Sequence, residues 1–244
     1  MNTLHEAAAA GDLAMLLRLL NEGVSVNAVE QRGSTPLHFA AVEVQIPAVE
    51  LLLRRGANPN IVDDDGRFPL WSAAVCGSLE MTLLLLENGA DTSVDTNGTT
   101  ALHAASAGGH IDVVKANLRF GAKVNQKDLG GKDRLALHWA AQEGYTEIGS
   151  LLLDHGADAD AQDEGGRTAL MTVASEGYYS FVEMLLARGV SINAQDIDGQ
   201  TALHFAIAWK HPNVERMLVE AGADLTIEDK EGRVAEAFRL GRKD

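Results

Sequence analysis

Residues 35–41 read Thr-Pro-Leu-His-Phe-Ala-Ala, and variants of this seven-residue motif return along the chain. The variants begin at positions 68, 100, 135, 168 and 201, so the successive steps are 33, 32, 35, 33 and 33 residues. Glycines at 23, 56, 89, 121, 156, 189 and 222 repeat with the same short step and the same long step. A period this regular indicates stacked supersecondary units, with the changes in length confined to loops.

Each repeat carries the local signals of two short helices. Thr35 can cap a first helix with its hydroxyl, and Pro36 suits the first helical position because its missing N–H has no partner there. Apolar residues at 49 and 51–53 predict a second helix that Gly56 ends. The polar stretch 57–66 then predicts a protruding hairpin-like loop, called a finger below.

The repeat motif and the Leu-Leu-x-x-Gly-Ala-Asp/Asn segments, such as residues 52–58 and 152–158, resemble the ankyrin repeat. The resemblance covers essentially the whole chain. It implies an all-α fold, an ankyrin-repeat α-solenoid of helix-turn-helix units with protruding hairpin loops. We expect a single domain over 1–244, with an N-terminal capping repeat at 1–31 and a truncated C-terminal cap at 230–244. The repeats between them are expected at 32–64, 65–95, 96–128, 129–163, 164–196 and 197–229.

Composition limits the possible partners and compartments. The net charge of −15 argues against nucleic acid, because phosphate binding needs clustered lysine and arginine, and it favours basic partners. No apolar run approaches the roughly 18 residues that span a bilayer, and the N-terminus does not resemble a signal peptide. A single cysteine, Cys76, suits a reducing compartment. We therefore expect a cytoplasmic or nuclear protein that binds no membrane and is a monomer when alone.

The search for chemistry finds no catalytic, cofactor or metal site, and we expect no enzyme and no cofactor. Five histidines recur at the same position of the repeat motif, so imidazoles in adjacent repeats should lie about 8–10 Å apart and cannot share a metal ion. We expect each of them to bond nearby loop backbone and so to hold the repeat geometry. No phosphate-cradling loop or nucleophile elbow is present. The histidines of the repeat motif are His5, His38, His103, His138 and His204.

Departures from the repeat pattern are informative. Asn117 interrupts a column of leucines, and a buried amide without partners costs about 1–3 kcal/mol. Either Asn117 finds hydrogen bonds or its repeat is the weak joint of the stack. The connection from Asp128 to Leu135 is two residues longer than usual and should form a larger, mixed-charge finger. Trp209 replaces small or polar counterparts, and it either anchors a partner or packs against the C-terminal cap.

The resemblance implies a non-enzymatic protein–protein interaction module, an adaptor, scaffold or inhibitor. Partners of such repeats usually engage the finger tips and the open face of the first helix. The alternative is a small-molecule or nucleotide sensor with its ligand between adjacent fingers. That would need a basic and aromatic pocket, whereas we expect the inter-repeat surface to be acidic. The candidate partner-binding residues are Arg32, Asp64, Asp65, Arg67, Arg134, Glu143, Glu164, Arg167, Glu176, Asp198 and Trp209, with further finger positions at Gln31, Asn97, Leu129 and Gly130.

Overall fold

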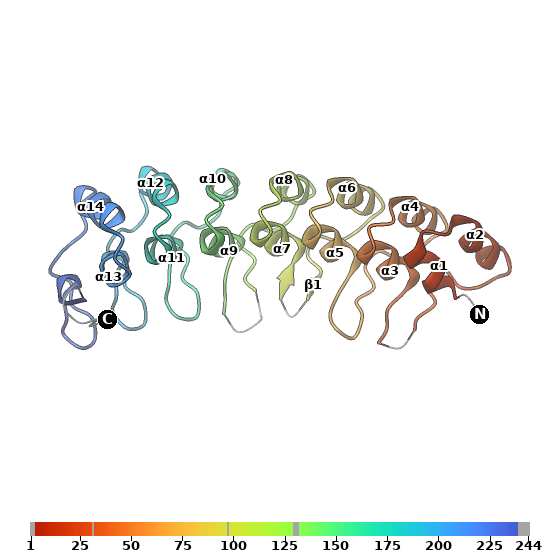
Figure 1. The fold of residues 1–244 in the computed structure, drawn as a ribbon, viewed down its shortest axis with the longest axis horizontal. Coiled ribbons are helices and arrows are strands. Elements are labelled where there is room, and N and C mark those ends of the chain that lie inside the picture. The colour runs from red at the N-terminus through yellow and green to blue at the C-terminus, as the bar shows by residue number, and fades with distance from the viewer. Residues whose placement is uncertain (1–2, 31, 97, 129–131, 239–244) are drawn as a thin grey trace. The chain divides into compact units, whose positions relative to one another are not determined.

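The computed structural model describes residues 3–30, 32–96, 98–128 and 132–238. Within these residues, fourteen α-helices alternate with loops, one hairpin has two-residue strands, and a short 3-10 helix lies near the C-terminus (Figure 1). The expected all-α fold of repeated helix-turn-helix units is therefore confirmed. The chain divides into two compact units, unit 1 at 1–123 and unit 2 at 124–244, and each is described by itself. The expectation of a single domain stays a prediction.

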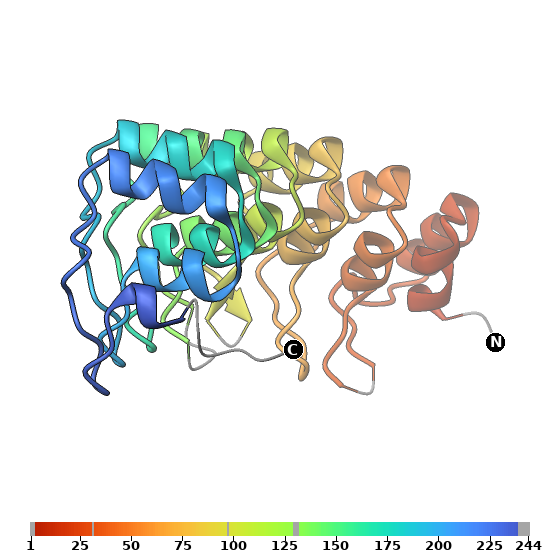
Figure 2. The same cartoon turned by 60° about the vertical axis from the view of Figure 1, so that its left-hand side comes forward.

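Unit 1 contains four helix pairs in two layers. Odd-numbered helices form one row and even-numbered helices form the other (Figures 1 and 2). The strands β1 (Asp95–Thr96) and β2 (Thr99–Thr100) pair antiparallel, with Asp95 opposite Thr100. The helices are α1 (Leu4–Ala10), α2 (Leu13–Asn21), α3 (Pro36–Val42), α4 (Ile46–Arg54), α5 (Pro69–Val75), α6 (Leu79–Glu87), α7 (Ala101–Ala107) and α8 (Ile111–Arg119).

Unit 2 contains three further pairs, again with the odd-numbered helices in one row, and ends in the 3-10 helix η1 (Ala235–Ala237) (Figure 1). Its fingers are closed by backbone hydrogen bonds, such as that from the N–H of Asp163 to the carbonyl of Arg167 at 3.0 Å. The expected hairpin-like loops are thereby confirmed. The helices are α9 (Ala136–Glu143), α10 (Thr146–Asp154), α11 (Ala169–Glu176), α12 (Tyr179–Ala187), α13 (Ala202–Ala208) and α14 (Pro212–Glu220).

The turn between the two helices of a pair needs a left-handed residue. Gly144 and Gly177 take φ of 75° and 76° there, and each ends a first helix. In two other repeats the same position holds Val44 and Lys210, with φ of 55° and 61°. A left-handed β-branched residue is strained. The geometry of the turn thus persists where the sequence signal for it is absent.

The motif histidines join the first helix to the next finger, as predicted. The backbone N–H of Thr35 donates to Nδ1 of His38 at 3.1 Å, and Nε2 of His38 lies 3.0 Å from the carbonyl of Arg67. His138 repeats the arrangement, with Nδ1 accepting from the N–H of Leu135 and Nε2 within 3.2 Å of two finger carbonyls. A carbonyl only accepts, so Nε2 must carry the proton of a neutral ring.

Burial has an electrostatic consequence for these rings. Desolvation lowers the pKa of His38, His138 and His204 below 6.5, and the opposing finger carbonyls and nearby aspartates only partly offset it. A second proton would have to enter at Nδ1, where a backbone N–H already points. The neutral ring is therefore part of the folded repeat.

The core of each pair forms where the motif predicts. Leu37, Ala40 and Ala41 are buried on α3, and Leu52 is buried on α4. The small alanines allow neighbouring helices to pack closely. Asn117 is fully buried in α8. Its Nδ2 donates to the carbonyl of Val113 at 2.9 Å, while its Oδ1 has no hydrogen-bond partner among the described residues. The amide is thus half satisfied, between the two alternatives that the sequence left open.

Candidate partner-binding surfaces

The finger tips are tied to one another within each unit by backbone hydrogen bonds. In unit 1 the N–H of Asp64 donates to the carbonyl of Arg32 at 2.8 Å. In unit 2 the N–H of Glu164 donates to the carbonyl of Lys132 at 2.9 Å, and Lys230 donates to Asp198 at 2.9 Å. Side chains at the tips are therefore presented on a fixed frame. Such preorganisation lowers the entropy cost of binding a partner.

Unit 1 uses most of its candidate charges internally. Asp63 is buried and accepts hydrogen bonds from the backbone N–H groups of Asp65 and Arg67, at 3.0 and 2.8 Å, and from the hydroxyl of Ser34 at 3.0 Å. The guanidinium of Arg67 lies 2.9 Å from Asp63 and 2.8 Å from Asp65, and Arg32 pairs with the same Asp65. We call these five residues the Asp63 network.

The Asp63 network keeps its central carboxylate ionised. Burial works to raise the pKa of Asp63, but the hydrogen bonds from Arg67 and Ser34 outweigh it, so the pKa lies below 3.8. Asp64 is exposed at the tip, and its carboxylate forms no ion pair with the described residues. Of the four candidate residues in unit 1, Asp64 is thus the one whose charge is not already engaged by described neighbours.

Arg134 of unit 2 is held inside its own finger. Its side chain is 13% exposed, its guanidinium stacks 3.6 Å from the ring centre of Trp139, and its Nε lies 3.4 Å from buried Asp128. The indole N–H of Trp139 donates to the same carboxylate at 3.2 Å. These contacts give Trp139 a structural role in the finger. The long finger is of mixed charge as expected, since Lys127 pairs with Asp133 at 3.0 Å.

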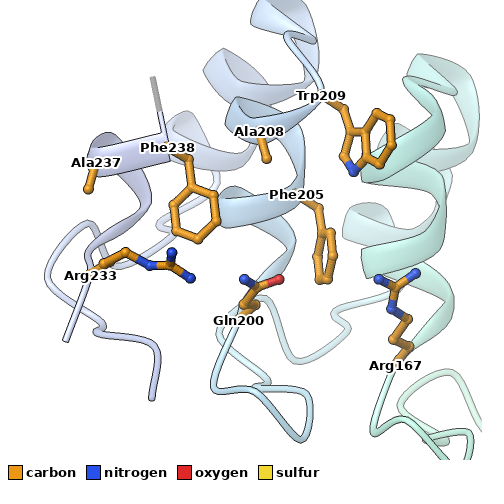
Figure 3. A pocket seen from close by; sticks show the side chains of 8 residues that line it. All are labelled: Arg167, Gln200, Phe205, Ala208, Trp209, Arg233, Ala237 and Phe238. Atoms are coloured by element: carbon orange, nitrogen blue, oxygen red, sulfur yellow. The ribbon is translucent and has the colours of Figure 1, made fainter. Parts of the chain in front are cut away.

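Arg167 stands in the same position before the repeat motif but makes different contacts. Its backbone N–H donates to Asp163 at 2.8 Å, whereas its exposed guanidinium lies 4.5 Å over the ring of Phe205 in the next repeat. Figure 3 shows this guanidinium directed toward Phe205, with Trp209 nearby. Within the described ranges of the chain, no carboxylate lies within ion-pair distance of Arg167. Its charge is therefore available to a ligand.

An aromatic pocket of about 380 Å³ opens beside Arg167 in unit 2 (Figure 3). Trp209 is 52% exposed and lines the pocket together with Ala237 and Phe238 of the C-terminal cap. No acidic side chain is among its described lining residues, so the expected acidic inter-repeat surface is wrong at this place. Net charge is an average over the chain and does not report one pocket. The lining residues are Arg167, Gln200, Phe205, Ala208, Trp209, Arg233, Ala237 and Phe238.

A second, polar pocket of about 440 Å³ lies on the other side of Arg167. It brings together four of the residues predicted from the sequence, namely Arg134, Glu164, Arg167 and Glu176. Glu143 adjoins this group, because its carboxylate accepts from the side-chain amide of Gln142, a lining residue of the polar pocket, at 3.3 Å. Asp198 is exposed and lines neither of the two pockets.

Sequence reasoning missed part of the aromatic pocket. Phe205 and Phe238 fill the fifth position of the repeat motif, which is also aromatic at Phe39 and Trp139 and is serine, alanine or threonine in the remaining internal repeats. Arg233 stands before the truncated last repeat, like Arg167 before its own. Comparing these two columns could have found the site. The finger positions Gln31, Asn97, Leu129 and Gly130 lie outside the described residues.

The described part of the chain holds no group of three or more histidine, cysteine, aspartate or glutamate side chains that could bind a metal ion. None of the helices in the described ranges combines the length and apolar character needed to cross a bilayer.

Comparison with known proteins adds an independent line of evidence. A family model described as ankyrin repeats in three copies matches residues 4–95, 44–128, 90–163 and 137–229. Protein phosphatase 1 regulatory subunit 27 from Homo sapiens is 35% identical over 74 residues, which is 30% of this chain and 47% of that protein. Its counterpart from Mus musculus is 38% identical over 77 residues, or 30% and 49% of the two chains. The alignment thus spans about half of each relative.

Two solved structures are similar over most of the chain. The ankyrin repeat domain of Bcl-3, described as a member of the IkappaB protein family, has a TM-score of 0.76 at 30% identity and covers 85% of this chain and 95% of that one. The human ASB11 ankyrin repeat domain has a TM-score of 0.79 at 27% identity, with coverage of 92% and 99%.

Proposed function

Because the chain belongs to the ankyrin repeat family, we propose that it is a non-enzymatic adaptor, scaffold or inhibitor that binds a partner polypeptide. Domains of this family generally mediate protein–protein interaction, and one relative is described as a phosphatase regulatory subunit. A fold alone does not specify a function, so the proposal also needs a surface that fits it.

The surface that supports the proposal is in unit 2. Trp209 is half exposed and lies in a pocket that shares Arg167 with the polar pocket carrying Glu164 and Glu176. An aromatic side chain surrounded by charged side chains on a rigid frame is typical of an interaction hot spot. The mixed charge favours a partner with both basic and acidic residues. Binding by a monomer inside the cytoplasm or nucleus remains part of the same proposal.

Affinity capture from the source lysate, followed by mass spectrometry, tests this function. We expect Trp209→Ala to raise the off-rate of the captured partner and to cost about 2 kcal/mol or more of binding free energy. Charge reversal at Glu164 and Glu176 should instead lower the on-rate and change its salt dependence. Surface plasmon resonance at two salt concentrations separates these effects.

A matched control lies on the second-helix row. Val219 of α14 is apolar and 39% exposed, and Val219→Ala should leave the partner's affinity unchanged. Loss of binding in Val219→Ala, with normal binding in Trp209→Ala, would contradict the proposed surface. Far-UV circular dichroism should be the same for all of these variants, because none of the substituted residues belongs to the repeat core.

A second candidate function has one observation in its favour. A sensor for a nucleotide or another small molecule needs a basic and aromatic pocket, and the aromatic pocket contains Arg167, Arg233 and three aromatic rings. Its volume of about 380 Å³ is also sufficient for a small ligand. A thermal shift assay with ATP distinguishes the two functions, because only the sensor should be stabilised by the nucleotide.

A further inference from the structure

We propose that the aromatic pocket of unit 2 recognises an acidic residue beside an apolar or aromatic residue in the partner polypeptide, with Arg167 as the group that binds the carboxylate. This inference rests on the proposed protein-binding function and names the chemistry of its partner. It also differs from the expectation drawn from net charge, which favoured basic partners throughout.

Four arginines stand directly before a repeat motif, and they differ in whether they have a carboxylate partner. Arg67 and Arg233 each bind two carboxylates of their own finger, at distances between 2.7 and 2.9 Å. Arg134, whose side chain is 13% exposed, pairs with buried Asp128. Among these four arginines, and within the described residues, Arg167 is the one without a carboxylate partner. An exposed guanidinium that has no internal partner can bind an external one without breaking an existing ion pair.

The finger of Arg167 lacks an acid that the fingers of Arg67 and Arg233 contain. The acids that close the other fingers, Asp65 and Glu231, each lie two residues after the finger aspartate. The equivalent residue in the Arg167 finger is Gly165, which has no side chain. The neighbouring Asp163 uses Oδ1 to accept from the backbone N–H of Arg167. Asp63 accepts from the backbone N–H of Arg67 in the same way but also pairs through Oδ2 with the guanidinium, whereas Asp163 forms no described ion pair with Arg167. The guanidinium of Arg167 instead extends toward the next repeat and stacks on Phe205.

The stacking of Arg167 on Phe205 leaves the guanidinium able to bind a carboxylate. A guanidinium lying over a ring keeps its N–H groups in its own plane, free to form paired hydrogen bonds with a carboxylate. Trp209 and Phe238 supply apolar surface in the same pocket, and Gln200 adds a neutral hydrogen-bonding group (Figure 3). The charge of Arg233 is already balanced by Asp229 and Glu231. One anionic group next to one apolar side chain thus complements the pocket.

The occupant is best matched by a polypeptide. Arg167 lines both the aromatic and the polar pocket, so the surface continues past the anion site toward Glu164 and Glu176. A chain that places an acid at Arg167 can therefore place polar or basic residues along the polar pocket. Trp209 is also 52% exposed, whereas sites for small molecules usually enclose most of the ligand's surface.

Selection from a displayed library of random 12-residue peptides against the full chain tests the inference. We expect enriched peptides to contain aspartate or glutamate next to phenylalanine, tryptophan or leucine. Fluorescence anisotropy of an enriched peptide should show affinity at least about tenfold weaker for Arg167→Gln, the loss expected of a charge-assisted hydrogen bond. Arg216→Gln, on α14 of the same unit, is the matched control and should remain within about twofold of the unmodified chain.

A second variant gives the finger of Arg167 the acid that Asp65 provides beside Arg67. Gly165→Asp supplies the missing acid. The backbone at Gly165 has no left-handed φ that would strain an aspartate, and the added Cβ meets only Oδ1 of Asp163, at 3.3 Å. It should weaken peptide binding about as much as Arg167→Gln, because Arg167 acquires an internal partner. Changing the peptide's acid to its amide should weaken binding to the unmodified chain but not to Arg167→Gln.

The outcomes separate this inference from the function on which it rests. If peptides are enriched but lack an acid, or if the acid-to-amide change is equally costly in Arg167→Gln, the anion site is wrong and the interaction module stands. If no peptide is enriched, both proposals fail. Stabilisation by ATP without any peptide binding would overturn the inference in favour of a small-molecule pocket.

Discussion

Arg67 in unit 1 and Arg167 in unit 2 occupy the same position of the repeat. Arg67 forms ion pairs with Asp63 and Asp65 of its own finger, whereas the exposed guanidinium of Arg167 stacks on Phe205 beside the aromatic pocket. The two fingers differ at a neighbouring residue, which is Asp65 in the first finger and Gly165 in the second, and Asp63 pairs with Arg67 whereas the equivalent Asp163 forms no described ion pair with Arg167. A repeat frame therefore does not assign a role to a side chain. The role depends on whether the same finger already satisfies the charge.

The largest expected effect concerns the aspartates that anchor the two fingers. Asp63→Ala should lower the free energy of unfolding by about 2–3 kcal/mol, because it removes a buried acceptor and leaves Arg67 with less compensation. Asp163→Ala should cost about 1 kcal/mol, since Asp163 accepts a single described hydrogen bond, from the backbone of Arg167. Urea denaturation at pH 7 measures both. Equal losses would show that the two fingers are stabilised in the same way.

The next effect sharpens the comparison between the helix cores. Leu152, Leu185 and Leu218 are buried in unit 2 at the position that Asn117 occupies in unit 1. Asn117→Leu should raise the free energy of unfolding by about 1–2 kcal/mol. It removes the buried Oδ1 that has no described hydrogen-bond partner, and this gain should exceed the loss of the hydrogen bond from Nδ2 to Val113. It should sharpen the unfolding transition by restoring coupling between repeats. Destabilisation would show that the amide is fully paired in solution.

The smallest effect is the response to acid. The pKa of His38 in unit 1, and of His138 and His204 in unit 2, is lowered below 6.5 mainly by burial. The unfolded chain then binds protons before the folded chain does. Stability should accordingly be complete above about pH 6.5 and fall as the pH drops below it. Urea midpoints at pH 7, 6 and 5 measure this loss.

A repeat of unit 2 supplies the control for the acid response, because Met171 stands where five other repeats have histidine. His138→Met copies that repeat. It should lower stability at pH 7 through the lost finger hydrogen bonds, and it should make the fall between pH 7 and pH 5 shallower. An unchanged slope would indicate that other groups carry the acid response.

The repeat length, the paired helices, the glycine turns and the role of the motif histidines could all be predicted from the amino-acid sequence. These features depend on residues close together in the chain, or on one position repeated at a fixed period, so a single sequence reveals them. It also identified Arg167, Glu164, Glu176 and Trp209 as candidates, without indicating which of them share a pocket.

The sequence could not reveal which charged side chains form ion pairs within their own finger, and the three-dimensional structure was needed for this. Arg67 and Arg167 are the same residue type at the same position, and separating them required knowing where each guanidinium lies relative to Asp65 and Phe205. Phe205 is 38 residues from Arg167 along the chain, and Phe238 reaches the pocket from the C-terminal cap. Such contacts depend on rotamers and on packing between neighbouring repeats, which the period of a sequence does not specify.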